Sequence, residues 1–124
     1  MRSQEWVVEF YESVPRQGQR KGTVPVEVLI RSFTAKSQTQ VIKKLELLAA
    51  RAPNLRKPHV KRVQGDILEL RLRPEGTPYR ILFFYPQYGR IVLLHGFKKS
   101  TRKTPKKEIK VAKSRMEDYL RRYQ

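Results

Sequence analysis

Cations and one carboxylate lie inside apolar runs of the chain, and they are the residues best suited to bind a ligand or take part in a reaction. Alternation over residues 66–73 predicts a strand whose polar face carries Glu69 and Arg71. Arg80 interrupts a second apolar run over residues 79–85. A guanidinium in such a strand needs an anionic partner, because burying an unpaired charge is costly. That partner is either Glu69 across the sheet or a phosphate, which fits the arginine fork, and both can hold.

Two lysines close a third apolar run, over residues 91–98. Strict alternation puts Lys98 on the same face as Val92, and Lys99 follows at the strand end. One consistent assignment places four charged residues on the sheet face away from the helices: Glu69, Arg71, Arg80 and Lys98. We therefore expect a concave cationic surface that contains one carboxylate.

The composition points to a polyanionic partner. The 124 residues include 28 Lys+Arg and 11 Asp+Glu, which gives a formal net charge of +17. So large an excess favours nucleic-acid binding, and the alternative is a basic protein whose charge only keeps it soluble. The chain has no cysteine, which excludes disulfides, thiolate nucleophiles and Cys-based metal sites. With two distant histidines and few acids, we expect no metal and no other cofactor.

Further cations flank the predicted strands. We expect seven residues to contact RNA: Lys57, His59, Lys61, Arg62, Arg73, Arg102 and Lys103. The basic run on the closing helix is equally consistent with a solvated face. By alternation His95 belongs with Leu93 and Phe97, so we interpret it as a packed or boundary histidine rather than a catalytic one.

Apolar spacing predicts one α+β domain over residues 1–124. An N-terminal strand precedes two helices, of which the first begins at Pro25 and the second is capped by Thr34 and ended by Pro53. An antiparallel sheet of three to four strands follows, with residues 60–63 as the additional strand. Thr104 and Pro105 are predicted as the cap and first position of a C-terminal helix.

We expect no association with a membrane. No apolar run approaches the roughly 18 residues that a membrane span needs. The opening residues 1–5 lack an apolar signal segment, so we expect a cytoplasmic protein.

Three segments, taken in order, resemble the RelE/HigB superfamily of bacterial toxins: residues 66–71, 78–84 and 91–101. The continuation over residues 102–109 into the last helix is similar to the phage-derived HigB-like branch. The helical pair and residues 55–58 also fit, so the resemblance covers nearly the whole chain. Each motif alone is weak, but their order and spacing together are fairly specific.

The resemblance implies a RelE-like fold and a metal-independent mRNA endonuclease that acts on ribosome-bound message. It also implies a cognate antitoxin, in this branch commonly a helix-turn-helix protein. By position, Arg71 and Arg80 correspond to the strand arginines of the family, and Lys98 and Lys99 to its closing basic pair. Glu69 stands where RelE has a lysine, and residues 100–104 lack the tyrosine that RelE has there. The general base and the general acid are therefore not assigned by the resemblance.

Metal-free RNA cleavage needs a base for the 2′-hydroxyl, cations for the phosphorane and a proton for the departing 5′-oxygen. We hypothesise that Arg71 and Arg80 hold the phosphate, with Lys99 or Lys98 at the leaving group. Glu69 is the candidate base, although an ordinary glutamate has a pKa of about 4.3. A lysine whose pKa is lowered by neighbouring cations is the alternative.

Two other functions share part of this pattern. A non-catalytic nucleic-acid or ribosome-binding protein would show the same charges. A ParE-like gyrase poison would share the fold, but those toxins generally lack the nuclease residues. Retention of Arg71, Arg80, Lys98 and Lys99 argues against the gyrase poison.

Overall fold

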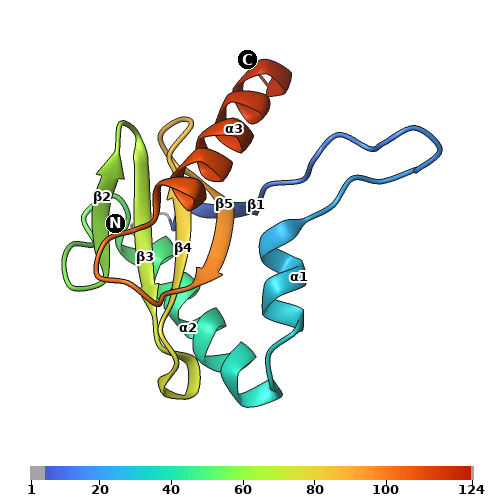
Figure 1. Cartoon of the computed structure of the whole chain (residues 1–124). Coiled ribbons are helices and arrows are strands. Elements are labelled where there is room, and N and C mark those ends of the chain that lie inside the picture. The colour runs from blue at the N-terminus through green and yellow to red at the C-terminus, as the bar shows by residue number, and fades with distance from the viewer. Residues whose placement is uncertain (1–4, 124) are drawn as a thin grey trace.

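One β-sheet lies between two layers of helix (Figure 1). The computed structural model describes residues 5–123. Residues 1–4 and 124 lie outside the described part. Most of the stretch in which we expect no signal segment, residues 1–5, therefore lies outside it as well. The elements in chain order are β1 (Val7–Phe10), α1 (Pro25–Arg31), α2 (Ala35–Arg51), β2 (Val60–Gln64), β3 (Ile67–Leu72), the 3₁₀ turn η1 (Pro74–Gly76), β4 (Tyr79–Phe84), β5 (Arg90–Lys98) and α3 (Lys106–Tyr123).

The sheet has the strand order β1-β5-β4-β3-β2. Strands β2 to β5 pair antiparallel, as the short connections between them predict. The N-terminal strand β1 joins the edge of the same sheet parallel to β5, so the sheet has five strands and is mixed. The predicted α+β class and element order are confirmed. The parallel partner of β1 lies about 80 residues further along the chain, where local patterning gives no signal.

The first two helices begin where the sequence predicts, whereas α3 begins at Lys106, one residue after the predicted Pro105. Pro25 is the first residue of α1, and the Thr34 hydroxyl caps α2 by accepting a hydrogen bond from the Ser37 amide at 3.1 Å. The Glu75 carboxylate in η1 accepts hydrogen bonds from the Thr34 and Ser37 hydroxyls. These contacts fasten the β3–β4 turn to the start of α2. Within residues 5–123, none of the helices combines the length and apolar composition needed to cross a bilayer.

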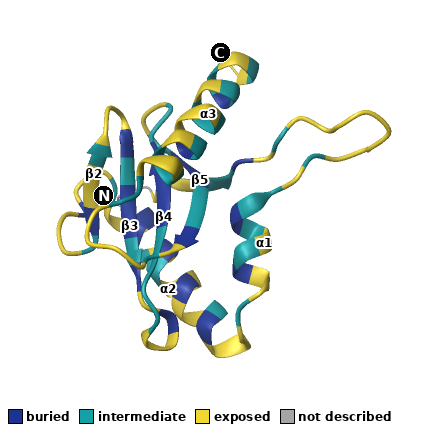
Figure 2. Cartoon of the chain, viewed as in Figure 1, coloured by how far each residue is buried: buried dark blue, intermediate teal, exposed yellow. Residues whose placement is uncertain are grey.

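Two hydrophobic clusters hold the layers together, one on each face of the sheet (Figure 2). On the first face, Leu70 and Ile81 pack with residues of α1 and α2 such as Leu48. On the second face, Leu82 packs with Ala112 of α3. Burial on both faces explains why β4 reads as a nearly continuous apolar run, in which Arg80 is an exception.

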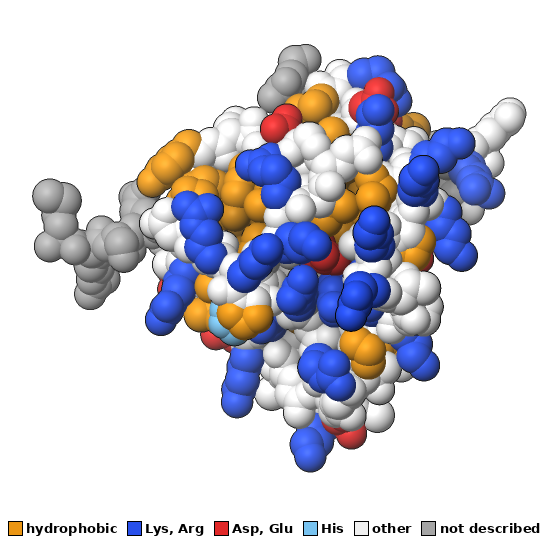
Figure 3. Space-filling view, turned by 60° about the vertical axis from the view of Figure 1, so that its left-hand side comes forward, with side chains coloured by type: hydrophobic (Ala, Val, Ile, Leu, Met, Phe, Trp, Pro, Cys, Tyr) orange, Lys and Arg blue, Asp and Glu red, His pale blue; other side chains and the backbone are white. Residues whose placement is uncertain are grey.

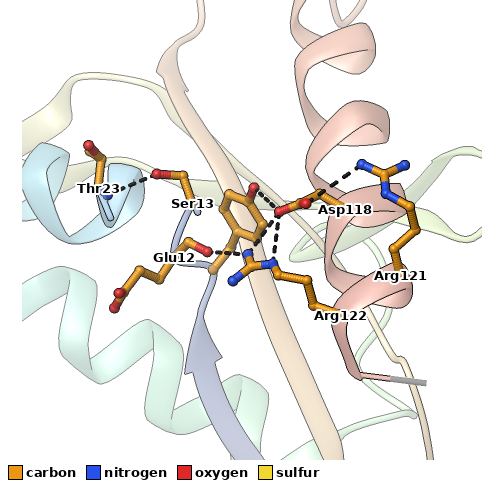
Figure 4. A network of polar contacts seen from close by, with 7 residues as sticks. Glu12, Ser13, Thr23, Asp118, Arg121 and Arg122 are labelled. Carbon is orange, nitrogen blue, oxygen red and sulfur yellow. Dashed lines mark hydrogen bonds and ion pairs between the residues drawn. The ribbon is translucent and has the colours of Figure 1, made fainter. Parts of the chain in front are cut away.

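A polar network fixes the C-terminal half of α3 against the end of β1 (Figure 4). The Tyr11 hydroxyl donates to Asp118 at 2.6 Å, and Arg122 pairs with the same carboxylate at 2.8 Å. The hydrogen bond from Tyr11 is the largest influence on the pKa of Asp118 and lowers it. Ser13 and Thr23 close the base of a long loop that extends beyond this network (Figure 1). These contacts therefore hold the C-terminal end of α3 in position over the second face of the sheet.

Candidate nucleic-acid interface and active site

Two arginines face each other directly across β3 and β4. Arg71 and Arg80 are partners in the antiparallel register, so both side chains leave the sheet on the α3 side. Like charges in directly opposed positions destabilise a sheet. The Nε atoms of both residues are buried, and within the described part of the chain neither has a hydrogen-bond partner. The pair therefore concentrates positive charge on the α3 side of the sheet.

Glu69 is the carboxylate beside this pair. Its side chain is almost fully buried, and its Oε1 lies 3.4 Å from Arg80 Nε, so the predicted ion pair across the sheet is present. The same oxygen accepts a hydrogen bond of 2.9 Å from the Thr104 hydroxyl. Burial lowers the pKa of Arg80; Glu69 opposes that shift, and Arg71 reinforces it. One carboxylate thus neutralises only part of the charge on this face.

Lys99 also belongs to the cluster. Its Nζ lies 3.4 Å from Thr104 Oγ1. Burial is the main cause that lowers the pKa of Lys99; Glu69 opposes this effect, and Arg80 and nearby cations strengthen it. A lowered pKa is what the alternative general base, a lysine in place of Glu69, requires. We define the cationic face as Lys61, Glu69, Arg71, Arg80 and Lys99.

Lys98 does not share this face, which corrects the assignment made from alternation. A bulge between β4 and β5 changes the register, so that Leu82 pairs with His95 but Phe83 pairs with Leu93. Beyond the bulge, Lys98 is the partner of Tyr79, whose ring packs against Phe33 on the side of α1 and α2. One extra residue in β5 reverses the facing of every residue after it.

The same bulge turns His95 toward α3. His95 Nε2 lies 2.9 Å from Glu108 Oε1, and its Nδ1 lies 3.1 Å from Arg115 Nη1. The ring stacks on Phe97, and burial lowers the pKa of His95. His95 is thus a boundary histidine, as predicted, and it ties the start of α3 to the sheet.

The seven predicted RNA contacts divide over the surface. Lys61 is the cross-strand partner of Glu69 and joins the cationic face. Arg73 lies near enough to lower the pKa of Arg80, and Arg102 and Lys103 are exposed in the connection between β5 and α3. His59 does not join the cationic face, because its Nδ1 lies 2.7 Å from Lys44 Nζ on α2.

Lys57 and Arg62 border a different hollow. They line it together with Leu68, whose side chain packs against the cluster of α1 and α2. The space-filling view shows many Lys and Arg side chains over the part of the molecule that contains the β2 edge (Figure 3). Positive charge therefore extends over both sides of this edge strand.

Thr104 is a site residue that the sequence did not reveal. We expected its hydroxyl to cap the last helix, but it donates to Glu69 and lies beside Lys99. Its only sequence signal is a hydroxyl residue five positions after the basic pair. Within residues 5–123, no group of three or more potential metal-ligating side chains is close enough to hold a metal ion.

Fold and face together define a small α+β protein whose sheet gathers arginine and lysine side chains on one face. Residues 29–117 match the family described as phage derived protein Gp49-like (DUF891). The chain belongs to this Gp49-like family, in agreement with the predicted phage-derived branch.

Relatives described as "Probable endoribonuclease HigB1" occur in two Mycobacterium tuberculosis strains, CDC 1551 / Oshkosh and H37Rv. Each is 38% identical to this chain over 65 residues, which is 52% of this chain and 50% of the relative. The chain thus spans about half the length of the curated relatives it matches. The predicted relation to HigB is confirmed as distant homology.

Proposed function

We propose that this protein is the toxin of a toxin–antitoxin system and acts as a metal-independent endoribonuclease on mRNA. The observation that carries the proposal is the opposed pair Arg71 and Arg80, with Lys99 beside it and a single carboxylate in contact. Homology to a probable endoribonuclease supports the same reaction class. The proposal includes action on ribosome-bound message in the cytoplasm and neutralisation by a cognate helix-turn-helix antitoxin.

The two guanidinium groups bind the scissile phosphate. Both side chains lie on one face of the sheet, and an arginine fork matches the spacing of non-bridging phosphate oxygens. In the transition state the phosphorane carries more negative charge than the substrate. The arginines then stabilise it more strongly than the ground state, and removing one such contact typically costs about 10²–10³ in rate.

Glu69 and Lys99 are the groups available for proton transfer. In the proposed step Glu69 accepts the proton of the 2′-hydroxyl, whose oxygen attacks phosphorus as the bond to the 5′-oxygen breaks. Lys99 donates a proton to that departing oxygen, and its lowered pKa makes its ammonium group a stronger acid. The products are a 2′,3′-cyclic phosphate and a 5′-hydroxyl.

Because Thr104 occupies Glu69 Oε1, the incoming 2′-hydroxyl must replace the threonine hydroxyl. Substrate binding and activation of the base are linked in this way. Thr104→Val should therefore lower the rate of cleavage less than Glu69→Gln, since valine leaves the carboxylate in place.

The test is an analysis of product ends. Purified protein is incubated with programmed ribosomes, and RNA ends are identified by mass spectrometry. We expect 2′,3′-cyclic phosphate ends, no cleavage of message with a 2′-deoxy residue at the cut site, and a loss of at least about 10²-fold in Arg80→Ala. Lys43→Ala, an exposed change on α2, is the matched control. Cutting at the 2′-deoxy position would refute the chemistry, and ribosome binding without any cleavage would favour the non-catalytic function.

A further inference from the structure

A hollow lies on the part of the molecule where the start of β1, the end of α2 and the β4–β5 turn meet. Its volume is about 730 Å³, and Trp6, Arg51, Asn54 and Tyr88 are among the residues that line it. Tyr88 is 85% exposed, and its ring centroid lies 4.8 Å from that of Trp6. A buried tryptophan thus supports an aromatic ring that is open to solvent.

A second hollow, of about 360 Å³, adjoins the first at Pro53, which lines both. Its exposed cations are Arg56, Lys57 and Arg62. Among the described residues that line the two hollows, Glu5 is the only acid. The surface therefore changes from aromatic to strongly cationic over a short distance.

We propose that the two hollows form a binding track for single-stranded RNA. An unpaired base stacks on Tyr88, and the sugar–phosphate backbone follows Arg56, Lys57 and Arg62. An aromatic platform beside a cationic groove is the combination that binds single-stranded nucleic acid without sequence readout. A duplex offers no free base face to Tyr88.

The track is distinct from the cationic face, because β2 directs alternate residues to opposite sides of the sheet. Lys61 pairs with Glu69 of the cationic face, whereas its neighbour Arg62 pairs with Leu68 and lines the track. Since β2 is an edge strand, a message can pass around it from one side to the other. In this respect the inference rests on the proposed function: it names where RNA beyond the cut site is held.

The experiment measures binding to a 5′-labelled 15-residue oligo(dU), which lacks the 2′-hydroxyl and is not cleaved, by fluorescence anisotropy at several salt concentrations. Tyr88→Ala should weaken binding about tenfold, and Tyr88→Phe should restore it. The triple variant Arg56→Ala/Lys57→Ala/Arg62→Ala should reduce the slope of log K against log salt by about 2. The matched control removes three cations from the loop before α1, Arg16→Ala/Arg20→Ala/Lys21→Ala, and should change the slope by less than about 1.

Wild-type affinity in Tyr88→Ala, or equal slopes in the two triple variants, would overturn the track. Equal losses on a duplex probe would overturn its preference for single strands. The binding assay does not depend on the nuclease proposal, because the probe is not cleaved and Tyr88 lies outside the cationic face. The nuclease proposal fails or holds in the cleavage assay alone.

Discussion

Replacing Glu69 by glutamine removes the one negative charge in contact with Arg80 while keeping the size of the side chain. The amide oxygen of glutamine can still accept the Thr104 hydroxyl, so the substitution isolates the ionic contribution. The side chain of Glu69 is 3% exposed and that of Arg80 is 15% exposed, so water screens the pair poorly. We expect Glu69→Gln to lower the free energy of unfolding.

The separation sets the magnitude. Opposite charges 3.4 Å apart attract by about 5 kcal/mol at an effective dielectric constant of about 20. Part of this attraction is offset by the cost of desolvating both groups, and breaking a buried pair costs about 3–5 kcal/mol when one charge is left behind. Because Arg80 keeps some contact with water, we expect a loss of about 2–3 kcal/mol.

Urea denaturation of a double-mutant cycle provides the assay. In an Arg80→Met background the pair no longer exists, so Glu69→Gln should then cost less than about 1 kcal/mol. Glu69→Gln also removes a negative charge from the cationic face, so it should strengthen RNA binding while it slows cleavage. A loss below about 0.5 kcal/mol in the wild-type background, or equal losses in both backgrounds, would refute the reasoning.

Three further predictions concern β5 and the residue that follows it. Lys99→Ala should reduce cleavage by about 10²-fold or more, whereas Lys98→Ala should leave the rate within about twofold, as initial rates on programmed ribosomes will show. Gly96→Ala should destabilise the fold by about 1 kcal/mol in urea titrations, because a Cβ there would lie 2.5 Å from Leu29 Cδ2 and the Leu29 side chain must move. Unchanged stability would mean that this side chain adapts freely. Burial lowers the pKa of His95 from 6.5, so the unfolded chain takes up a proton first as the pH falls. The stability from His95 is complete above about pH 6.5 and declines below it, as the pH falls through the lowered pKa; melting temperatures at pH 7.5 and 5.5 should differ less in His95→Gln than in the wild type.

Local patterning predicted most of the elements. Pro25, Thr34 and Pro53 mark helix boundaries because their backbone and capping preferences act over a few residues. The alternation around Glu69 and Arg71 correctly placed both on the face opposite Leu70, because β3 has no irregularity against β4. The prediction that this face lies away from the helices is wrong, because α3 packs on it. The pairing of β1 with β5 depends on contacts between distant segments, and no short-range pattern encodes it.

The candidate site was predicted only in part, because one extra residue in β5 shifts the register between β4 and β5. Alternation assumes that every residue advances the strand by one step, and the bulge in β5 breaks that assumption before Lys98. Thr104 was overlooked for a related reason, since a hydroxyl before a proline is also typical of a helix cap. Its contact with Glu69 arises because the connection from β5 returns across the sheet.

The central claim is that Arg71, Arg80 and Lys99 act on a single phosphodiester. A crystal structure with a message fragment that carries a 2′-deoxy residue at the cut site tests this most directly. The account predicts both guanidinium groups within about 3 Å of the non-bridging oxygens of one phosphate, with Lys99 Nζ next to the 5′-oxygen of that phosphate. Placement of the cut site away from β3 and β4, or contact of its phosphate with Lys98 in place of Lys99, would contradict it.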